Sequence, residues 1–303
     1  MKILVTGAKG LLGEKLTTLL DTTPGIDLVA TARNPLPYQL CRGKFIPLDI
    51  TDPREVSLVI EKTLPDVVIN TAAMTQVDQC ETERGKCWLA NVTAVEHLAH
   101  ACKTTNAKLI HISTDFIFDG TRELLQEDER PAPVNYYGES KLAGEEAIKR
   151  SGIDWAIART VLVYGVATDP GRSNIVLWAK KSLEEGKPIH VVNDQWRTPT
   201  LAEDLAMGCY LMAIKNARGV FHISGEELMT PYDIVIRTAK FFKLDATLVK
   251  ATDSTHFRQP ALRPLKTGFN IGKAKNTLGY APHTFIEGLG ILEEQFQKLA
   301  TKK

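Results

Sequence analysis

The chain has 303 residues, of which 44% are apolar and 24% are charged, and its 37 basic and 36 acidic residues leave a formal net charge of +1. This composition is typical of a globular protein with a large buried core, and it excludes global disorder. Because the charges nearly balance and the uncharged stretches are too short to span a bilayer, we expect neither a nucleic-acid binder nor a membrane protein.

Short β-branched runs alternate with longer amphipathic stretches along the chain. Several runs lack apolar/polar alternation, as expected for strands that are covered on both faces. The N-terminus enters the first run at once, so we expect no signal peptide. The alternation predicts an α/β fold with a doubly wound parallel sheet of the Rossmann type. Helices are expected at Leu11–Leu20, Thr82–Thr104 and Tyr137–Arg150, and strands at Ile3–Thr6, Asp27–Thr31, Lys44–Leu48, Asp66–Asn70, Lys108–Ser113, Trp155–Ala158, Pro188–Val192 and Val220–Ile223.

A glycine-rich turn joins the first strand to the first helix, with the spacing G-x-x-G-x-x-G at Gly7, Gly10 and Gly13. Glycine permits a tight turn and lets backbone N–H groups approach a pyrophosphate, which then faces the positive end of the helix dipole. We therefore predict that Gly7, Gly10, Leu11, Leu12 and Gly13 bind a dinucleotide cofactor. The alternative is an ordinary tight turn between a strand and a helix.

The end of the second strand bears on the choice of cofactor. It lacks a carboxylate that could bind a ribose 2′-hydroxyl, and Arg33 could instead meet a 2′-phosphate, which favours NADP(H) over NAD(H). Otherwise Arg33 is a solvated loop residue. Asp49 and Ile50 follow the third strand and could contact the adenine, although Asp49 could equally cap the turn into Thr51-Asp52-Pro53.

The fourth and fifth strands end in small and polar residues, at the edge where open α/β sheets bind ligands. Thr71, Ala72 and Ala73 leave room for the nicotinamide ribose. Thr114 could donate a hydrogen bond to a substrate carbonyl oxygen as negative charge develops there, or it could cap a turn. Asp115 could accept hydrogen bonds from sugar hydroxyls or form an Asx turn.

Tyr137 and Lys141 stand four residues apart, so a helix places both on one face. Reduction of a ketone needs a proton donor beside the carbonyl oxygen while hydride reaches the carbon. A nearby ammonium lowers the pKa of a phenol, and the same lysine can hold the nicotinamide ribose. We therefore predict Thr114, Tyr137 and Lys141 as the catalytic set. Asn91 could hold a water or a backbone carbonyl in a proton relay, or serve as a surface or capping residue.

The alternation of elements loosens after about residue 165. We expect an NADP-binding domain over residues 1–165 and a smaller α/β substrate-binding part over residues 166–303, with some late segments returning to the first domain. The five cysteines are odd in number and include no C-x-x-C pair. This pattern argues against a disulfide scaffold or a zinc site and suits a reducing cytoplasm.

In these segments the chain resembles extended short-chain dehydrogenases/reductases and, more narrowly, the dTDP-4-dehydrorhamnose reductase family. The glycine turn and the Tyr/Lys pair mark the superfamily alone, whereas the segments that begin at Ser113 and Asp194 are more specific. The matching segments are Thr6–Gly13, Ile69–Ala73, Val77-Asp78 with Glu81, Ser113–Gly120, Tyr137–Glu145, Arg159-Thr160 with Val163–Gly165, Asp194–Thr200, Gly219–Gly225 and Arg263-Pro264.

The resemblance implies reduction of the C4 ketone of a nucleotide-linked sugar by NADPH, with dTDP-4-dehydro-L-rhamnose as the expected substrate. It implies that Tyr137 is the general acid, that Lys141 modulates its pKa and holds the ribose, and that Thr114 is the third catalytic residue. A homodimer is expected at the level of the family. The residues expected at the nucleotide-sugar pocket are Asp115, Phe116, Asn174, Asp194 and Trp196.

Four positions depart from the family pattern. Leu162 stands where an aromatic residue often packs on the sugar, Phe116 lacks the usual tyrosine hydroxyl, and Arg197 occupies a position where glycine is common. Lost hydrogen-bond partners change sugar preference, so these positions bear on which sugar is bound. Lys15 stands where some members have a glutamate that holds Mg²⁺, which predicts no such metal site here.

Two other functions are open. The regulatory β subunit of methionine adenosyltransferase resembles this family, so the chain could be a non-catalytic NADP-binding regulator. Phe116 and Leu162 favour this function, whereas the intact catalytic set weighs against it. An epimerase or dehydratase of the same superfamily is the third candidate. A dehydratase needs an Asp-Glu pair beside the threonine, and here Phe116 follows Asp115.

Overall fold

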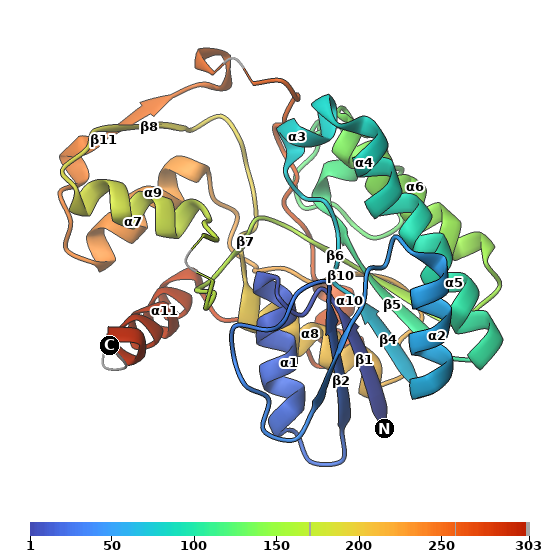
Figure 1. Ribbon diagram of the computed structural model, residues 1–303. Helices are drawn as coiled ribbons and strands as arrows, with labels where there is room; N and C mark the ends of the chain where they lie inside the picture. The colour runs from blue at the N-terminus through green and yellow to red at the C-terminus, as the bar shows by residue number, and fades with distance from the viewer. Residues whose placement is uncertain (170, 258, 301–303) are drawn as a thin grey trace.

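Seven parallel strands form the central sheet of the computed structural model, which describes residues 1–169, 171–257 and 259–300 (Figure 1). They are β1 (Lys2–Thr6), β2 (Asp27–Ala32), β3 (Lys44–Pro47), β4 (Val67–Asn70), β5 (Lys108–Thr114), β6 (Trp155–Thr160) and β10 (Gly219–His222). In space they stand in the order β10-β6-β5-β4-β1-β2-β3. The chain order thus runs outward in both directions from the β1–β4 boundary, which confirms the predicted doubly wound sheet.

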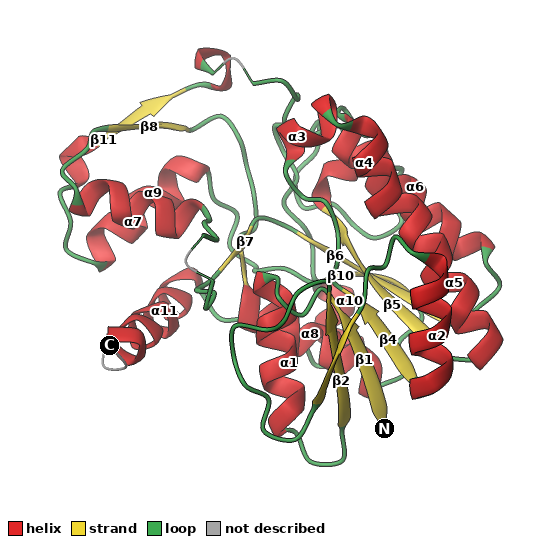
Figure 2. Cartoon of the chain, viewed as in Figure 1, coloured by secondary structure: helices red, strands yellow, loops and turns green. Residues whose placement is uncertain are grey.

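Helices cover both faces of this sheet (Figure 2). Leu4 of β1 enters the core on one face, whereas its neighbours Ile3 and Val5 enter the core on the other. Burial on both faces explains why the strands read as continuous apolar runs. In the described part of the chain, no helix combines the length and the apolar character that a bilayer span requires. One face carries α1 (Leu11–Thr22), α8 (Ala202–Ile214) and α10 (Gly272–Leu278), and the other carries α2 (Pro53–Thr63), α5 (Ala94–Thr105) and α6 (Tyr136–Arg150).

A smaller α/β part lies beside the sheet, at the upper left of Figure 1. Two parallel strands, β8 and β11, pack against helices α7 and α9, and a second parallel pair, β7 and β9, leads into this part. Helix α11 packs on the same core as β7 and α9. These elements are β7 (Val163–Tyr164), α7 (Ile175–Glu184), β8 (Ile189–Val192), β9 (Thr200–Leu201), α9 (Pro231–Phe241), β11 (Val249–Thr252) and α11 (Phe285–Ala300).

Each of the eight predicted strands is present, with ends shifted by at most two residues. The single helix predicted over Thr82–Thr104 is wrong. The chain instead forms α3 (Val77–Thr82), a break at Glu83, α4 (Arg84–Trp88), a π-helix over Leu89–Thr93 and then α5. The wider turn at Leu89–Thr93 directs a polar residue into the core, which an uninterrupted amphipathic pattern does not reveal.

Candidate active site

Three polar side chains form a row across the middle of the sheet, near the carboxyl ends of β1, β4 and β5. The parallel register pairs Thr6 with Asn70 and Asn70 with His111. Each of the three is at most 1% exposed. The row lies on the face that α6 covers, because His111 Nε2 is 3.1 Å from Nζ of Lys141 on that helix. Buried polar groups are costly unless they are hydrogen-bonded, so this row marks a special position in the sheet.

The glycine turn between β1 and α1 is packed too closely for side chains. Gly7 has a φ of +70°, and a Cβ there would lie 2.7 Å from the backbone nitrogen of Ala72. A Cβ on Gly13 would lie 2.2 Å from the Gly7 carbonyl oxygen. Gly10 gives α1 no side-chain cap, so the backbone N–H groups of Leu11–Gly13 have no side-chain acceptor in the described part of the chain. This cradle of free N–H groups fits a pyrophosphate.

The residues predicted at the adenine end follow β2 and β3. Arg33 is exposed, and its side chain has no partner among the described residues. Asp49 accepts hydrogen bonds from the Thr51 N–H at 2.9 Å and the Thr51 hydroxyl at 2.8 Å, so it forms the turn cap that was its alternative role. Ile50 is buried in the core under α2 and α5. Contact of these residues with a cofactor stays a prediction.

The segment after β4 passes beside the glycine turn. The Thr71 hydroxyl donates to the Thr6 carbonyl oxygen at 2.6 Å, and the Ala72 N–H donates to Asn70 Oδ1 at 3.2 Å. Thr71, Ala72 and Ala73 are only half-buried. Their small side chains permit the close approach to the glycine turn and leave the edge of the sheet open.

Asn91 lies in the π-helix and fixes the backbone that follows this segment. Its Oδ1 accepts from the Met74 N–H at 2.9 Å, and its Nδ2 donates to the Met74 carbonyl oxygen at 3.0 Å. Nδ2 is also 3.0 Å from the Ser140 hydroxyl on α6. Of the roles considered for Asn91, the structure shows the contact with a backbone carbonyl. A Cβ on Gly144 of α6 would lie 2.5 Å from the Asn91 carbonyl oxygen, so this helix crossing is close.

Tyr137 and Lys141 lie one turn apart on α6, which begins after the capping side chain of Asn135. Both are buried, at 8% and 2% exposure. Burial raises the pKa of Tyr137 and lowers that of Lys141 to about 8. Lys141 Nζ donates to the Ile112 carbonyl oxygen at 2.6 Å and contacts His111. Among the described residues no hydrogen bond joins Nζ to the Tyr137 hydroxyl, and a side-chain hydrogen bond with Thr114 opposes the rise in the pKa of the phenol.

Thr114 and Asp115 form a hydrogen-bond network at the end of β5. The Thr114 hydroxyl donates to Asp115 Oδ1 at 3.0 Å and accepts from the Phe116 N–H at 3.2 Å, so Thr114 caps a turn. Asp115 Oδ2 accepts from the Thr267 hydroxyl and lies 3.7 Å from Arg197 Nε. Burial raises the pKa of Asp115, and the Arg197 charge opposes that rise. Both residues lie at the expected edge, and their contacts with a substrate stay predictions.

The loop that contains Trp196 is fixed to a late segment of the chain. The backbone N–H of Trp196 donates to the Leu265 carbonyl oxygen at 2.6 Å. Arg197 is 3% exposed, and its guanidinium donates to the carbonyl oxygens of Pro264 at 2.6 Å and Leu265 at 3.0 Å. It also lies over the Phe116 ring, 5.8 Å from the centroid. Arg197 therefore braces two loops behind Phe116, a role that glycine could not fill.

The other predicted pocket residues differ in how far their polar atoms are engaged. Asn174 caps α7 and donates to the Gly165 carbonyl oxygen at 2.7 Å, so it serves the fold. Asp194 Oδ2 accepts from the Ser254 N–H and hydroxyl, at 2.8 and 2.6 Å. Its Oδ1 is buried and has no partner within the described ranges. Phe116 packs edge-on against Tyr137, with ring centroids 5.8 Å apart.

Lys15 and Leu162, two positions singled out in the sequence, have structural contacts. Lys15 forms an ion pair with Glu203 at 3.0 Å, between α1 and the first turn of α8. Leu162 has a φ of +39° and packs against the core that contains Tyr164. Neither residue reaches the Thr6–His111 row in the contacts described here.

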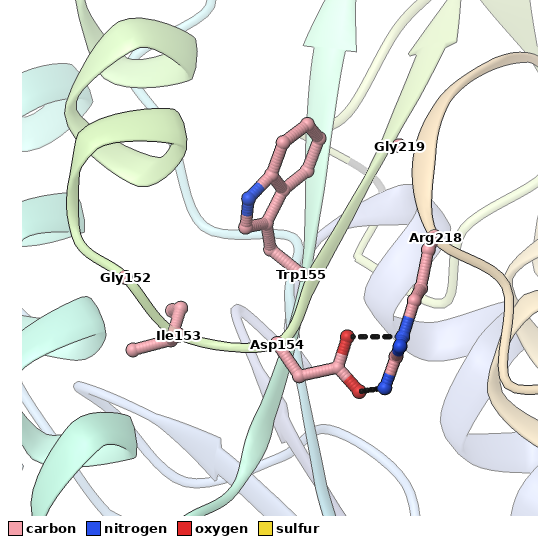
Figure 3. Close-up of a pocket in the computed structure, with 6 residues that line it drawn as sticks. All are labelled: Gly152, Ile153, Asp154, Trp155, Arg218 and Gly219. Atoms are coloured by element: carbon pink, nitrogen blue, oxygen red, sulfur yellow. Dashed lines mark hydrogen bonds and ion pairs between the residues drawn. The ribbon is translucent and has the colours of Figure 1, made fainter.

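A shallow hollow of about 450 Å³ lies at the opposite, amino-terminal ends of β6 and β10 (Figure 3). Gly152, Trp155 and Gly219 line it, and Figure 3 shows Asp154 and Arg218 directed toward one another. Their ion pair has a Nε–Oδ1 distance of 3.1 Å. Because its charged groups are already paired and it is open to solvent, this hollow is a poor candidate for a ligand site.

Sequence reasoning assigned no role to Asn70, His111 and Tyr38. The Tyr38 hydroxyl donates to the Ala8 carbonyl oxygen at 2.8 Å and so fixes the loop after β2 against the glycine turn. A signal for the first two was present, because each is a polar residue within an otherwise apolar strand. Only the register shows that they are neighbours.

Comparisons with known proteins find relatives along most of the chain. Residues 1–297 match the family model described as the RmlD substrate binding domain. The probable low-salt glycan biosynthesis reductase Agl14 of Haloferax volcanii is 32% identical over 98% of both chains. A dTDP-4-dehydrorhamnose reductase of Mycobacterium tuberculosis is 33% identical over 86% of this chain and 82% of the relative. Methionine adenosyltransferase 2 subunit beta of Pongo abelii is 30% identical over 100% of this chain and 89% of the relative.

Solved structures show the same architecture. A dTDP-4-dehydrorhamnose reductase from Clostridium acetobutylicum superimposes with a TM-score of 0.86 at 28% identity, over 98% of this chain and 100% of the other. A dTDP-4-dehydrorhamnose reductase from Bacillus anthracis in complex with NADP gives 0.83 at 27% identity, over 97% and 99%. These similarities confirm the predicted Rossmann-type α/β fold.

Proposed function

This chain belongs to the RmlD substrate-binding-domain family, the family of the dTDP-4-dehydrorhamnose reductases, and we propose that it is an NAD(P)-dependent oxidoreductase that reduces a ketone of a nucleotide-linked sugar. The observation that carries this proposal is that the Thr114 side chain is hydrogen-bonded to Tyr137, with Lys141 one turn further along α6. The row from Thr6 to His111 connects this set to the glycine turn. Family membership agrees with the resemblance found in the sequence.

In the proposed reaction the N-terminus of α1 and Arg33 hold the cofactor, which supplies the hydride when bound. The Tyr137 hydroxyl donates its proton to the ketone oxygen, which becomes the product hydroxyl. The Thr114 hydroxyl turns from Asp115 toward the same oxygen and donates a hydrogen bond while charge develops there. Lys141, in its protonated form, stabilises the Tyr137 phenolate until the phenol regains a proton.

The substrate proposed is dTDP-4-dehydro-L-rhamnose, and the reductant proposed is NADPH. The relatives support the substrate, since reductases named for dTDP-4-dehydrorhamnose cover most of this chain. Two observations support NADPH. Arg33 is exposed after β2 and has no side-chain partner within residues 1–169, 171–257 and 259–300, and the Bacillus anthracis relative was solved with NADP.

The direct test follows NADPH absorbance after the purified chain is mixed with dTDP-4-dehydro-L-rhamnose. We expect one NADPH to be oxidised for each dTDP-L-rhamnose formed, and a Tyr137→Phe variant serves as the inactive control. A panel of other dTDP- and UDP-linked keto sugars tests the substrate class. Failure of the purified chain to oxidise NADPH with every member of the panel would remove the proposal.

A non-catalytic NADP-binding regulator is the second candidate. The Thr114–Asp115–Thr267 network favours it, because the proposed catalytic threonine is engaged within the protein. The similarity of the whole chain to a methionine adenosyltransferase subunit points the same way. Purification with a stoichiometric partner enzyme whose rate the chain changes would support this candidate. Turnover by the chain alone would exclude it as the main function.

A cytoplasmic location and a homodimer are further proposals drawn from the family. Light scattering of the purified chain, at several concentrations, tests the second. A mass of about twice the monomer's 33.5 kDa supports a dimer, and a monomeric mass at every concentration contradicts it.

A further inference from the structure

Lys141 is a buried amine without a carboxylate partner. At 2% exposure it forms no ion pair with any carboxylate of the described residues. The groups that face it are Glu145 on its own helix, the thiols of Cys80 on α3 and Cys87 on α4, and the His111 ring on β5. The Glu145 carboxylate accepts two hydrogen bonds from the guanidinium of Arg159 on β6, at 2.9 and 2.8 Å. A buried ammonium in such surroundings is costly, so the protonation state of Lys141 needs an explanation.

The amide of Asn70 has only one orientation that satisfies its neighbours. The backbone N–H of Ala72 donates to Oδ1 at 3.2 Å, and a backbone N–H cannot act as an acceptor. The Thr6 hydroxyl donates to the same oxygen at 2.5 Å. Asn70 Nδ2 therefore faces His111 Nδ1, at 3.0 Å, as a donor. It follows that Nδ1 of His111 carries a lone pair and no hydrogen.

The other nitrogen of the His111 ring then determines the state of Lys141. Burial lowers the pKa of His111 well below its ordinary range, so the ring is neutral and its one N–H is on Nε2. Nε2 lies 3.1 Å from Lys141 Nζ. An ammonium can only donate hydrogen bonds, so a protonated Lys141 would place its N–H groups against the Nε2–H of His111 with no acceptor between them. A neutral amine has a lone pair and can accept from it, while still donating to the Ile112 carbonyl oxygen.

We propose that His111 is a positioning residue for Lys141: the hydrogen-bond chain Thr6–Asn70–His111 fixes the Nε2–H form of the imidazole, which favours the neutral amine of Lys141 over its ammonium form in the ligand-free protein. The three residues of this hydrogen-bond chain are register partners on the adjacent strands β1, β4 and β5, so the sheet fixes their relative positions. This state does not depend on any reaction.

Its consequence for catalysis rests on the proposed reductase activity. A neutral Lys141 cannot stabilise the Tyr137 phenolate by charge, so the amine must leave His111 and take one proton from solvent before it can do so. The Nε2–H of His111 is then the group that opposes this protonation. The hydrogen-bond chain Thr6–Asn70–His111 thereby helps to set the pKa of Lys141, above which the lysine is no longer charged.

The test of the proposal is the tautomer of His111, observed by ¹⁵N NMR of the full chain labelled at histidine, without ligands. A His111→Gln variant assigns the signal among the seven histidines. We expect an unprotonated Nδ1 and a protonated Nε2 from about pH 6 to pH 9. A protonated Nδ1 or an imidazolium in this range would overturn the proposal, and neither result depends on enzymatic activity.

Two variants separate the role of Asn70 from that of the lysine. In Asn70→Asp the new carboxylate accepts from Nδ1–H, and Nε2, which then has a lone pair, accepts from the Lys141 ammonium. The Nε2 proton passes to the amine and the Nδ1 proton is taken from solvent, so the tautomer should reverse. In Lys141→Met the tautomer should stay as in the wild type. An unchanged His111 tautomer in Asn70→Asp, or a reversed one in Lys141→Met, would contradict the proposed hydrogen-bond chain Thr6–Asn70–His111. Asn135→Asp, the same substitution at another buried amide, is the matched control and should leave His111 unchanged.

Kinetics supply the readout that a merely structural role would not move. If the chain is a reductase, kcat/KM should fall as pH rises through the pKa of Lys141. Asn70→Asp should shift this alkaline limb upward by about one pH unit or more, with Asn135→Asp leaving it in place. If Asn70→Asp is active and its alkaline pH limb is not shifted, the proposed effect of His111 on the catalytic lysine is refuted. If the wild type turns over no keto sugar, the reductase assignment is refuted, and the tautomer result is unaffected.

Discussion

Substitution of Gly7 by alanine tests whether the glycine turn is a cradle for a dinucleotide or only a tight turn. The φ of +70° costs an alanine about 1–2 kcal/mol. The new Cβ would also lie 2.7 Å from the Ala72 backbone nitrogen, so the segment after β4 has to move. Such overpacking costs a further ~1–3 kcal/mol. The free energy of unfolding should therefore fall by about 2–5 kcal/mol.

Gly25 supplies a matched control within the same chain. Its φ is +79°, but a Cβ there has nothing within 4 Å. Gly25→Ala should thus show the backbone strain alone, about 1–2 kcal/mol. The difference between the two variants isolates the contact between the glycine turn and the segment after β4.

Urea denaturation and calorimetric titration with NADPH provide the two measurements. Gly7→Ala should weaken NADPH binding by about tenfold or more, since displacement of the turn moves the N–H groups at the start of α1. Gly25→Ala should bind NADPH like the wild type. A Gly7→Ala variant that is no less stable than Gly25→Ala, or that folds and keeps the wild-type affinity for NADPH, would contradict a cradle at the glycine turn.

Three further substitutions probe the catalytic and charged groups. Tyr137→Phe should lower kcat by on the order of a hundredfold or more with NADPH affinity retained, and equal rates would deny the general-acid role. Arg33→Ala should weaken NADPH more than NADH in fluorescence titrations, whereas equal weakening would contradict the 2′-phosphate contact. Glu145→Gln leaves the buried Arg159 unpaired and should lower the free energy of unfolding by about 3–5 kcal/mol at neutral pH. Burial raises the pKa of Glu145, but the bonds and charge of Arg159 outweigh it and hold the pKa lowered. The pair therefore stabilises the fold above the ordinary carboxyl pKa of ~4.3, and this stability is lost as pH falls through the lowered pKa. The difference in urea midpoint between wild type and variant should shrink on acidification. A constant difference would count against the assignment.

The sequence was informative wherever local pattern decides structure. The eight strands and the glycine turn follow from apolar runs and from the steric needs of a tight turn. The π-helix around Asn91 could not be predicted, because Asn91 contacts Met74 and Ser140, which are distant from it in sequence.

Long-range pairing limited the prediction of the site in the same way. Tyr137 and Lys141 could be paired from their helical spacing, since that spacing is local. The partners of Lys141 depend on the register of β4 and β5, and those of Asp115 on a hydroxyl 152 residues away. Residues that meet through such contacts leave no periodic trace in a single sequence.

The connectivity of the sheet also bears on how the protein forms during its synthesis. Six of its strands are complete once residue 160 has left the ribosome, yet α8 and α10, which cover one face, and β10, which closes one side, all follow residue 201. A nascent chain that ends near residue 165 therefore presents uncovered apolar strands such as β5 and β6 to solvent. Stable folding of the amino-terminal half has to wait for the carboxyl-terminal third, and a fragment truncated there is expected to aggregate.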